Sequence, residues 1–207
     1  MNIVNGIQRG NIQMIFDEIL NTIENDDMRK FAEVLIDTIP PYFYEVGASS
    51  SGKYHAQYCL GKGGLLRHTL ALVRLLNYTL EIESIKEQFT SRERDLMRIA
   101  GMMHDTRKSG SQEEWEVDPH TRFEHPVLVA NVILEFGNKG YLPNNELIDL
   151  SNICATHMGQ YNTSKYSDTI LPVPCNKMEI MVHQMDYLAS RKDIEVHCEM
   201  NNELKIQ

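Results

Sequence analysis

The sequence has no closely spaced cysteine pair. Its four cysteines lie far apart, at Cys59, Cys154, Cys175 and Cys198, so a cysteine zinc site is not indicated. Glycine and proline are also scarce, with 12 and 7 among 207 residues, which argues against a β-rich or a disordered chain. These absences indicate an ordinary globular protein with reduced thiols.

Long apolar segments are missing as well. No run approaches the roughly 20 residues of a membrane-spanning helix, and the first residues, MNIVNGIQRGNIQ, lack the apolar core of a signal peptide. We therefore expect a cytoplasmic protein without a membrane partner.

Basic residues are outnumbered by acidic ones, 20 against 29, and the formal net charge is -9. Affinity for long nucleic acids comes largely from Lys and Arg side chains that neutralise phosphates. The charge balance therefore argues against stable binding of a duplex. It still allows a local basic pocket, so the expected substrate is a phosphorylated small molecule or a short nucleic-acid strand. Oligomerisation is left open.

The apolar residues that are present recur at helical spacing along most of the chain. Asn11 is a candidate cap for a first helix and Asp27 for a second, which ends at Ile39-Pro40-Pro41 because proline cannot continue a helix. Further helices are predicted at roughly 65–80, 91–105, 126–137, 145–158 and 176–191. The expected fold is an all-α helical bundle with an N-terminal helical pair.

The chain is expected to form a single domain over residues 1–207. Residues 1–43 would be an N-terminal helical extension and 65–192 the core. Between them, residues 44–64 read as a loop, and a loop of this length in a small domain is usually functional or disordered. We favour a functional loop beside the active site. The tail, 193–207, could hold one short strand or wrap the surface.

Histidine and aspartate fall on the apolar faces of several predicted helices. His68 shares a face with Leu65 and Leu72, and His104, His157 and Asp186 occupy similar positions on three other helices. A single histidine on such a face is usually a hydrogen-bonded core residue. Four helices that each aim such a group inward indicate a shared cation, since neutral imidazoles and carboxylates are metal ligands.

Asp105 directly follows His104 in the sequence. Adjacent residues on a helix point about 100° apart, so Asp105 can reach the ion that His104 binds and a second ion as well. A carboxylate has two oxygens and can bridge two cations.

The order of these residues resembles the HD-domain superfamily of metal-dependent phosphohydrolases. The resemblance rests on GGLLRHTL with His68, GMMHDTRK with His104 and Asp105, and MVHQMDYLASRK with Asp186. Two further motifs, FEHPVLVANVIL and ICATHMGQYN, add His125 and His157, as in the two-metal subgroup. The pattern is closest to the HD domain of the 3′–5′ exoribonucleases of Gram-positive bacteria, although residues 11–39 are expected to be helical here and not an oligonucleotide-binding barrel.

The resemblance implies two divalent metal ions per chain. One ion would be held by His68, His104, Asp105 and Asp186, and the other by Asp105, His125 and His157. Manganese or iron suits mixed imidazole and carboxylate ligands, and nickel, zinc or magnesium are alternatives. The implied activity is hydrolysis of phosphoester bonds by a metal-activated water, with Asp105 and Lys108 as catalytic residues.

Five residues are candidates for substrate binding. Arg67 lies beside His68 and can make a forked contact with phosphate, and Lys53 and His55 lie on the glycine-flanked loop. Tyr161 could stack on a base, and Arg191 lies near the end of the last predicted helix. His183 is assigned no role, and the acidic stretch around Trp115 is expected to be a surface loop or a lid.

Three functions follow from this pattern. The first is a phosphohydrolase or phosphodiesterase that acts on nucleotides or short oligonucleotides, which we favour. The second is a 3′–5′ exonuclease on single-stranded RNA or DNA. The third is a non-catalytic regulator that binds nucleotide, which a complete set of hydrolytic ligands disfavours.

Overall fold

The computed structural model describes residues 3–4, 7–49, 52 and 55–194, and within them the fold is helical, as predicted. The only β-strands among these residues are two residues long, β1 (Ile3–Val4) and β2 (Ile7–Gln8), which pair antiparallel. The α-helices of this part are α1 (Arg9–Leu20), α2 (Asp26–Ile36), α3 (Gly64–Leu80), α4 (Glu83–Lys86), α5 (Ser91–Met103), α6 (Gln112–Val117), α7 (His125–Gly137), α8 (Asn144–Thr156) and α9 (Lys177–Ser190). Three short 3-10 helices span Pro41–Tyr44, Gln57–Cys59 and Lys192–Ile194.

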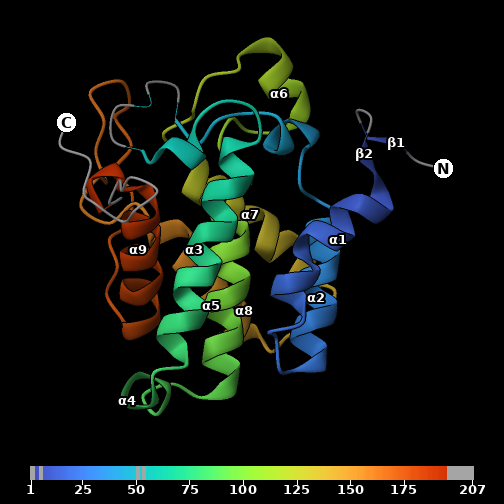
Figure 1. The fold of residues 1–207 in the computed structure, drawn as a ribbon, viewed down its shortest axis with the longest axis vertical. Helices are drawn as coiled ribbons and strands as arrows, with labels where there is room; N and C mark the ends of the chain where they lie inside the picture. The colour runs from blue at the N-terminus through green and yellow to red at the C-terminus, as the bar shows by residue number, and fades with distance from the viewer. Residues whose placement is uncertain (1–2, 5–6, 50–51, 53–54, 195–207) are drawn as a thin grey trace, which may run out of the picture.

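The long helices pack as a bundle around α3 and α5. In Figure 1, α9 lies on one side of this pair and the α1–α2 pair on the other, while α8 contacts α5, α7 and α9. The close approach of α3 to α5 depends on Gly101, because a Cβ there would lie 2.7 Å from Leu72 and 3.3 Å from Val73. Fully buried side chains such as Leu76, Leu96 and Ile153 fill the space between the helices.

The N-terminal helical pair begins elsewhere than the sequence suggests. The first helix starts at Arg9, so Asn11 lies inside it and is not its cap, and the second starts after Asn25 and not after Asp27. The backbone N–H groups before α2 are satisfied by Asp95 of α5, whose buried carboxylate accepts from Glu24 and Asn25 at 2.9–3.1 Å. A cap supplied from 70 residues away has no local sequence signal.

Two segments expected to be loops contain short helices. Residues 57–59 of the 44–64 loop form a 3-10 turn. The acidic stretch around Trp115 forms α6, which a reciprocal pair of hydrogen bonds between Ser111 and Glu114 caps at its start. The tail, for which one short strand was considered, spans 193–207; its first two residues belong to the 3-10 helix Lys192–Ile194, and residues 195–207 lie outside the described residues. Among the described residues no helix has the length and apolar character to cross a membrane.

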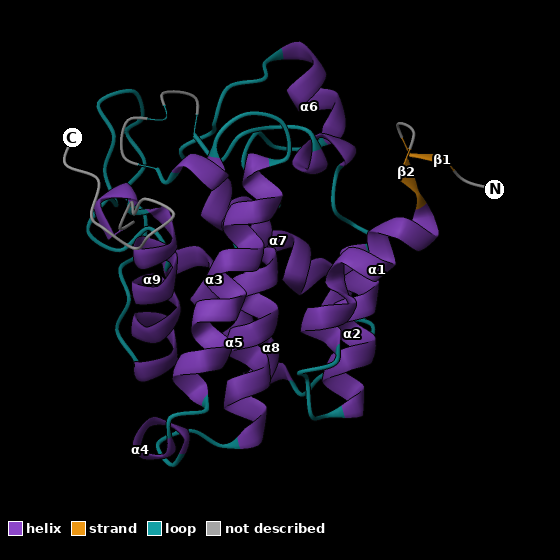
Figure 2. Cartoon of the chain, viewed as in Figure 1, coloured by secondary structure: helices purple, strands orange, loops and turns teal. Residues whose placement is uncertain are grey.

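Five helix termini meet at one end of the bundle, where most connecting loops also gather (Figure 2). Helices α3 and α7 begin there, and α5, α8 and α9 end there. Helix termini leave backbone groups unpaired and are followed by irregular chain, so this end is where polar side chains can be placed and held. All six predicted metal ligands lie there.

Candidate metal centre

The six predicted ligands come from five helices and converge on one buried cluster. His68 lies in the second turn of α3, and Asp186 lies four residues before the end of α9. His104 and His157 directly follow the last residues of α5 and α8, and His125 is the first residue of α7. All four histidines and Asp105 are at most 2% exposed, and the Asp186 side chain is 17% exposed.

The cluster consists of two halves that share Asp105. In the first, which we call the Asp186 half-site, His68 and His104 lie 3.3 Å apart at Nε2, and both face Asp186 Oδ1, at 2.9 and 3.6 Å. Asp105 Oδ2 lies 4.0 Å from His68 Nε2 and 3.5 Å from His104 Nε2. The ligand atoms of His68, His104 and Asp105 are close enough to hold one ion, and Asp186 adjoins this group through the two histidines.

In the second, the His157 half-site, His125 and His157 lie 3.2 Å apart at Nε2. Both face the other oxygen of Asp105, Oδ1, at 3.0 and 3.5 Å. One carboxylate therefore presents one oxygen to each half-site, which is the arrangement that a bridging ligand requires.

Backbone carbonyls fix the ring orientation of three of the histidines. Nδ1 of His104 lies 2.8 Å from the Gly101 carbonyl, and Nδ1 of His157 lies 2.7 Å from the Cys154 carbonyl. These are carbonyls of a last helical turn, which lack an intrahelical partner. A carbonyl can only accept, so each Nδ1 carries a hydrogen, and in the neutral form of each ring it is the Nε2 lone pair that faces the cluster.

The His125 ring is also oriented by a backbone carbonyl, with Nδ1 at 2.7 Å from the Arg122 carbonyl oxygen. Burial lowers the pKa of its imidazole to about 4, although the neighbouring Asp105 acts in the opposite direction, so the ring is neutral near pH 7. The His157 half-site thus brings together two nitrogen lone pairs and Asp105 Oδ1, which has no hydrogen-bond donor. Three acceptors without a proton between them fit a cation.

The acidic residues of the cluster are ionised in this environment. Burial opposes ionisation of Asp105, but the Lys108 ammonium and His104 outweigh it and hold the pKa of that carboxyl well below its usual range. Burial likewise opposes ionisation of Asp186, and the hydrogen bond from His68 and the nearby His104 lower its pKa despite this. Lys108 Nζ lies 2.6 Å from Asp105 Oδ2, so the ammonium adjoins the cluster directly.

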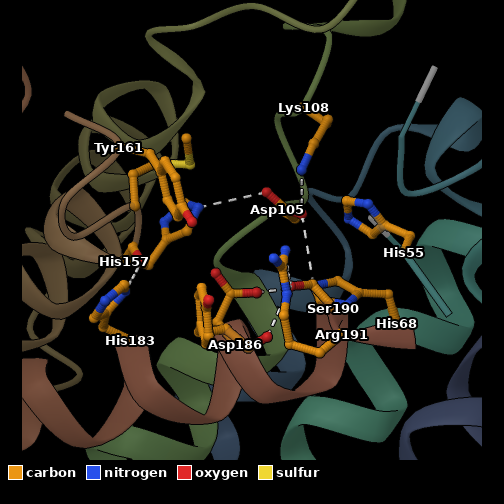
Figure 3. A pocket seen from close by; sticks show the side chains of 12 residues that line it. His55, His68, Asp105, Lys108, His157, Tyr161, His183, Asp186, Ser190 and Arg191 are labelled. Carbon is orange, nitrogen blue, oxygen red and sulfur yellow. Dashed lines mark hydrogen bonds and ion pairs between the residues drawn. The ribbon is translucent and has the colours of Figure 1, made fainter. Parts of the chain in front are cut away.

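A cavity of about 160 Å³ opens onto the cluster (Figure 3). Its walls include Lys108 and three of the predicted substrate residues, His55, Tyr161 and Arg191. Burial, together with the proximity of His68, lowers the pKa of His55 to about 4. The volume is below the roughly 300–1,000 Å³ of most small-molecule pockets, so only the reacting part of a larger substrate fits inside.

Arg67, another predicted substrate residue, is not brought to this cavity. Arg67 donates to the carbonyls of Tyr58 and Leu60, at 2.6 and 2.9 Å, and lines a separate cavity on the outer face of α3. The fixed position of its side chain gives no support to the predicted phosphate contact. Lys53 lies outside the described residues.

Several cavity residues had no assigned role in the sequence, notably His183 and Tyr187. Both lie on α9, three residues before and one after Asp186, so the helical period would have placed His183 near the ligand face. Tyr187 has no such signal, because adjacent residues point about 100° apart and its orientation depends on packing against Tyr161. Met158 and Ser190 complete the lining.

Comparison with protein-family models, with curated proteins and with solved structures found no match. The conclusions about this centre therefore rest on its geometry.

Proposed function

We propose that this chain is a metal-dependent phosphohydrolase that cleaves phosphoester bonds of nucleotides or short oligonucleotides. The observation that carries the proposal is the convergence of ligand atoms in the two half-sites, with Asp105 facing both. A hydrogen-bonded core cluster would pair each acceptor with a donor, whereas Asp105 Oδ1 has none.

The residues could hold two divalent ions: His68, His104 and Asp186 would bind one, His125 and His157 the other, and Asp105 could contribute to both. When bound, such a pair of ions lowers the pKa of a water molecule and neutralises charge on the phosphoryl oxygens. The ions would also offset the negative charge of the two buried carboxylates, of which Asp105 is paired with the Lys108 ammonium group.

Lys108 is ion-paired with a cluster carboxylate, Asp105, at 2.6 Å. Its ammonium group lies at the wall of the cavity, where it can donate to a non-bridging phosphate oxygen. His55, neutral near pH 7, faces the same space and can hydrogen bond to the ester. The narrow cavity admits the phosphoester while limiting water around it.

A substrate panel tests the proposal. Protein loaded with Mn²⁺ is given mononucleotides, dinucleotides, cyclic nucleotides and 20-residue RNA and DNA, at low and moderate salt. We expect release of phosphate or nucleotide, with higher specific activity on the short substrates because the net charge of -9 repels a long polyanion. A preference for the 20-residue strands that disappears as salt rises would favour the exonuclease alternative, and no turnover of any substrate would reject the proposal.

A further inference from the structure

Two tyrosines and an arginine form a layered stack beside the candidate metal centre. The rings of Tyr161 and Tyr187 are nearly parallel, with an interplanar angle of 12° and centroids 6.4 Å apart. The guanidinium carbon of Arg191 lies 4.5 Å from the centroid of the Tyr187 ring. All three residues line the cavity that contains Asp105 and Lys108.

The two tyrosines of the stack lie close in sequence to ligands of both half-sites. Tyr161 follows His157 by four residues, and Tyr187 is next to Asp186. Figure 3 shows Tyr161 above His157 and Arg191 close to Asp186. The stack therefore has a fixed position relative to the ligands of both half-sites.

The turn that carries Tyr161 is held against α9 by His183. Nδ1 of His183 donates to the His157 carbonyl at 2.7 Å, and its Nε2 lies 3.0 Å from the side chain of Gln160. Gly159 has a φ of +54°, and a Cβ at this position would lie 2.1 Å from the His183 ring. Glycine is required both for the turn and for the contact with His183, so the position of Tyr161 is set before any ligand binds.

Tyr161 remains 49% exposed although its ring is part of this stack. Packing against Tyr187 covers part of the Tyr161 surface. The exposed part of the ring, at the mouth of the cavity, can stack on another planar group. The cavity itself is too small for more than the reacting phosphoester, so the rest of a substrate must lie at its mouth.

We infer that Tyr161, supported by Tyr187 and Arg191, is the base-binding subsite of this centre and selects substrates with an unpaired nucleobase over phosphoesters that lack one. This inference rests on the proposed function only for the placement of the phosphate in the cavity. A stacked, paired base within a duplex cannot present its face to Tyr161, so the ligand is a nucleotide or the terminal nucleotide of a single strand.

Equilibrium binding tests the subsite without requiring turnover. Calorimetric titrations with adenosine monophosphate and with ribose 5-phosphate differ only in the base. We expect wild-type protein to bind the nucleotide about tenfold more tightly, in line with the usual strength of base–aromatic stacking. Tyr161→Leu should remove this difference and leave the affinity for ribose 5-phosphate unchanged, and Tyr161→Phe should retain it.

Tyr166→Leu is the matched control, because Tyr166 lies on the same loop, is 85% exposed and does not line the cavity. It should bind both ligands as the wild type does. A wild type without preference for the nucleotide, or a Tyr161→Leu variant that keeps the preference, would overturn the subsite. Loss of hydrolysis in every assay with the binding preference intact would instead reject the proposed function and leave the subsite standing.

Discussion

The two half-sites differ in whether a histidine can donate a proton to the carboxylate oxygen that it faces. In the Asp186 half-site, His68 Nδ1 faces only the Cys59 thiol at 4.0 Å, a weak partner that does not fix the tautomer. His68 can therefore carry its proton on Nε2 and donate it to Asp186 at 2.9 Å. In the His157 half-site, both rings are fixed by carbonyls and no proton is available for Asp105 Oδ1.

This difference shows that the same residue types can have different requirements for a cation. The Asp186 half-site can exist without metal as a hydrogen-bonded cluster. With both of its rings neutral, the His157 half-site has no such arrangement, and a cation could take the place of the missing proton. Asp105 couples them, because each of its oxygens faces one half-site, while Lys108 contacts only Oδ2.

Asp105→Ala should have the largest effect, because it removes a ligand from both half-sites. We expect hydrolysis to fall by at least ~10³-fold, more than the loss of one electrostatic contact usually costs, and both ions to be lost. Helicity by circular dichroism should stay at the wild-type level, since Asp105 lies beyond the end of α5. Wild-type turnover by this variant, with unchanged metal content, would refute the bridging role.

His157→Ala separates the two half-sites. It leaves the ligands of the Asp186 half-site in place, so elemental analysis should find about one ion per chain and hydrolysis should fall by roughly 10²-fold. His120→Ala is the control, because the His120 side chain is 81% exposed and pairs with Asp118 outside the cavity. Loss of both ions in His157→Ala would show that the halves do not bind metal separately.

Lys108→Met tests the role of the Lys108 ammonium group, which contacts only the Asp105 oxygen that faces the Asp186 half-site. Loss of the ammonium should lower turnover by about 10–100-fold, because a contact to the phosphate oxygen is lost. Metal affinity should be retained or increased, since the variant lacks the positive charge that competes with a metal ion for Asp105 Oδ2. Lys139→Met, at an exposed position over Phe136, should change neither property. Loss of metal in Lys108→Met would contradict this assignment.

His125 makes the metal-free protein sensitive to acid. Its pKa is about 4 in the fold against an ordinary 6.5, so the unfolded chain binds more protons between these values. The contribution to stability is complete above about pH 6.5 and is lost as pH falls towards 4. Denaturant titrations at pH 7 and pH 5 measure how far the free energy of unfolding falls as the pH is lowered. We expect this fall to be roughly 2 kcal/mol smaller in His125→Gln than in the wild type. Equal losses would remove the basis for a neutral His125.

Local periodicity predicted the helices of the core and the inward positions of His68, His104, His157 and Asp186, whereas Asp105 followed from its place beside His104 and His125 only from the resemblance. The helices expected near 65–80 and 126–137 are α3 and α7, and the inward faces of His68 and His104 follow from their apolar neighbours. Helix packing then brings these faces together.

Features that depend on contacts between distant segments were not predictable. The capping of α2 by Asp95 and the stacking of Tyr187 on Tyr161 each join segments far apart in the chain. The direction of Arg67 is set by the carbonyls of the preceding loop, whereas its sequence position beside His68 suggested the cavity. Adjacency in sequence does not give adjacency of side chains on a helix.

The central claim is that Asp105 joins two metal half-sites within one cluster. It is tested most directly by elemental analysis of protein purified without chelator and then equilibrated with excess Mn²⁺. The account predicts close to two ions per chain in the wild type, about one in His157→Ala and none in Asp105→Ala. A wild-type stoichiometry that stays at one under metal excess would contradict it.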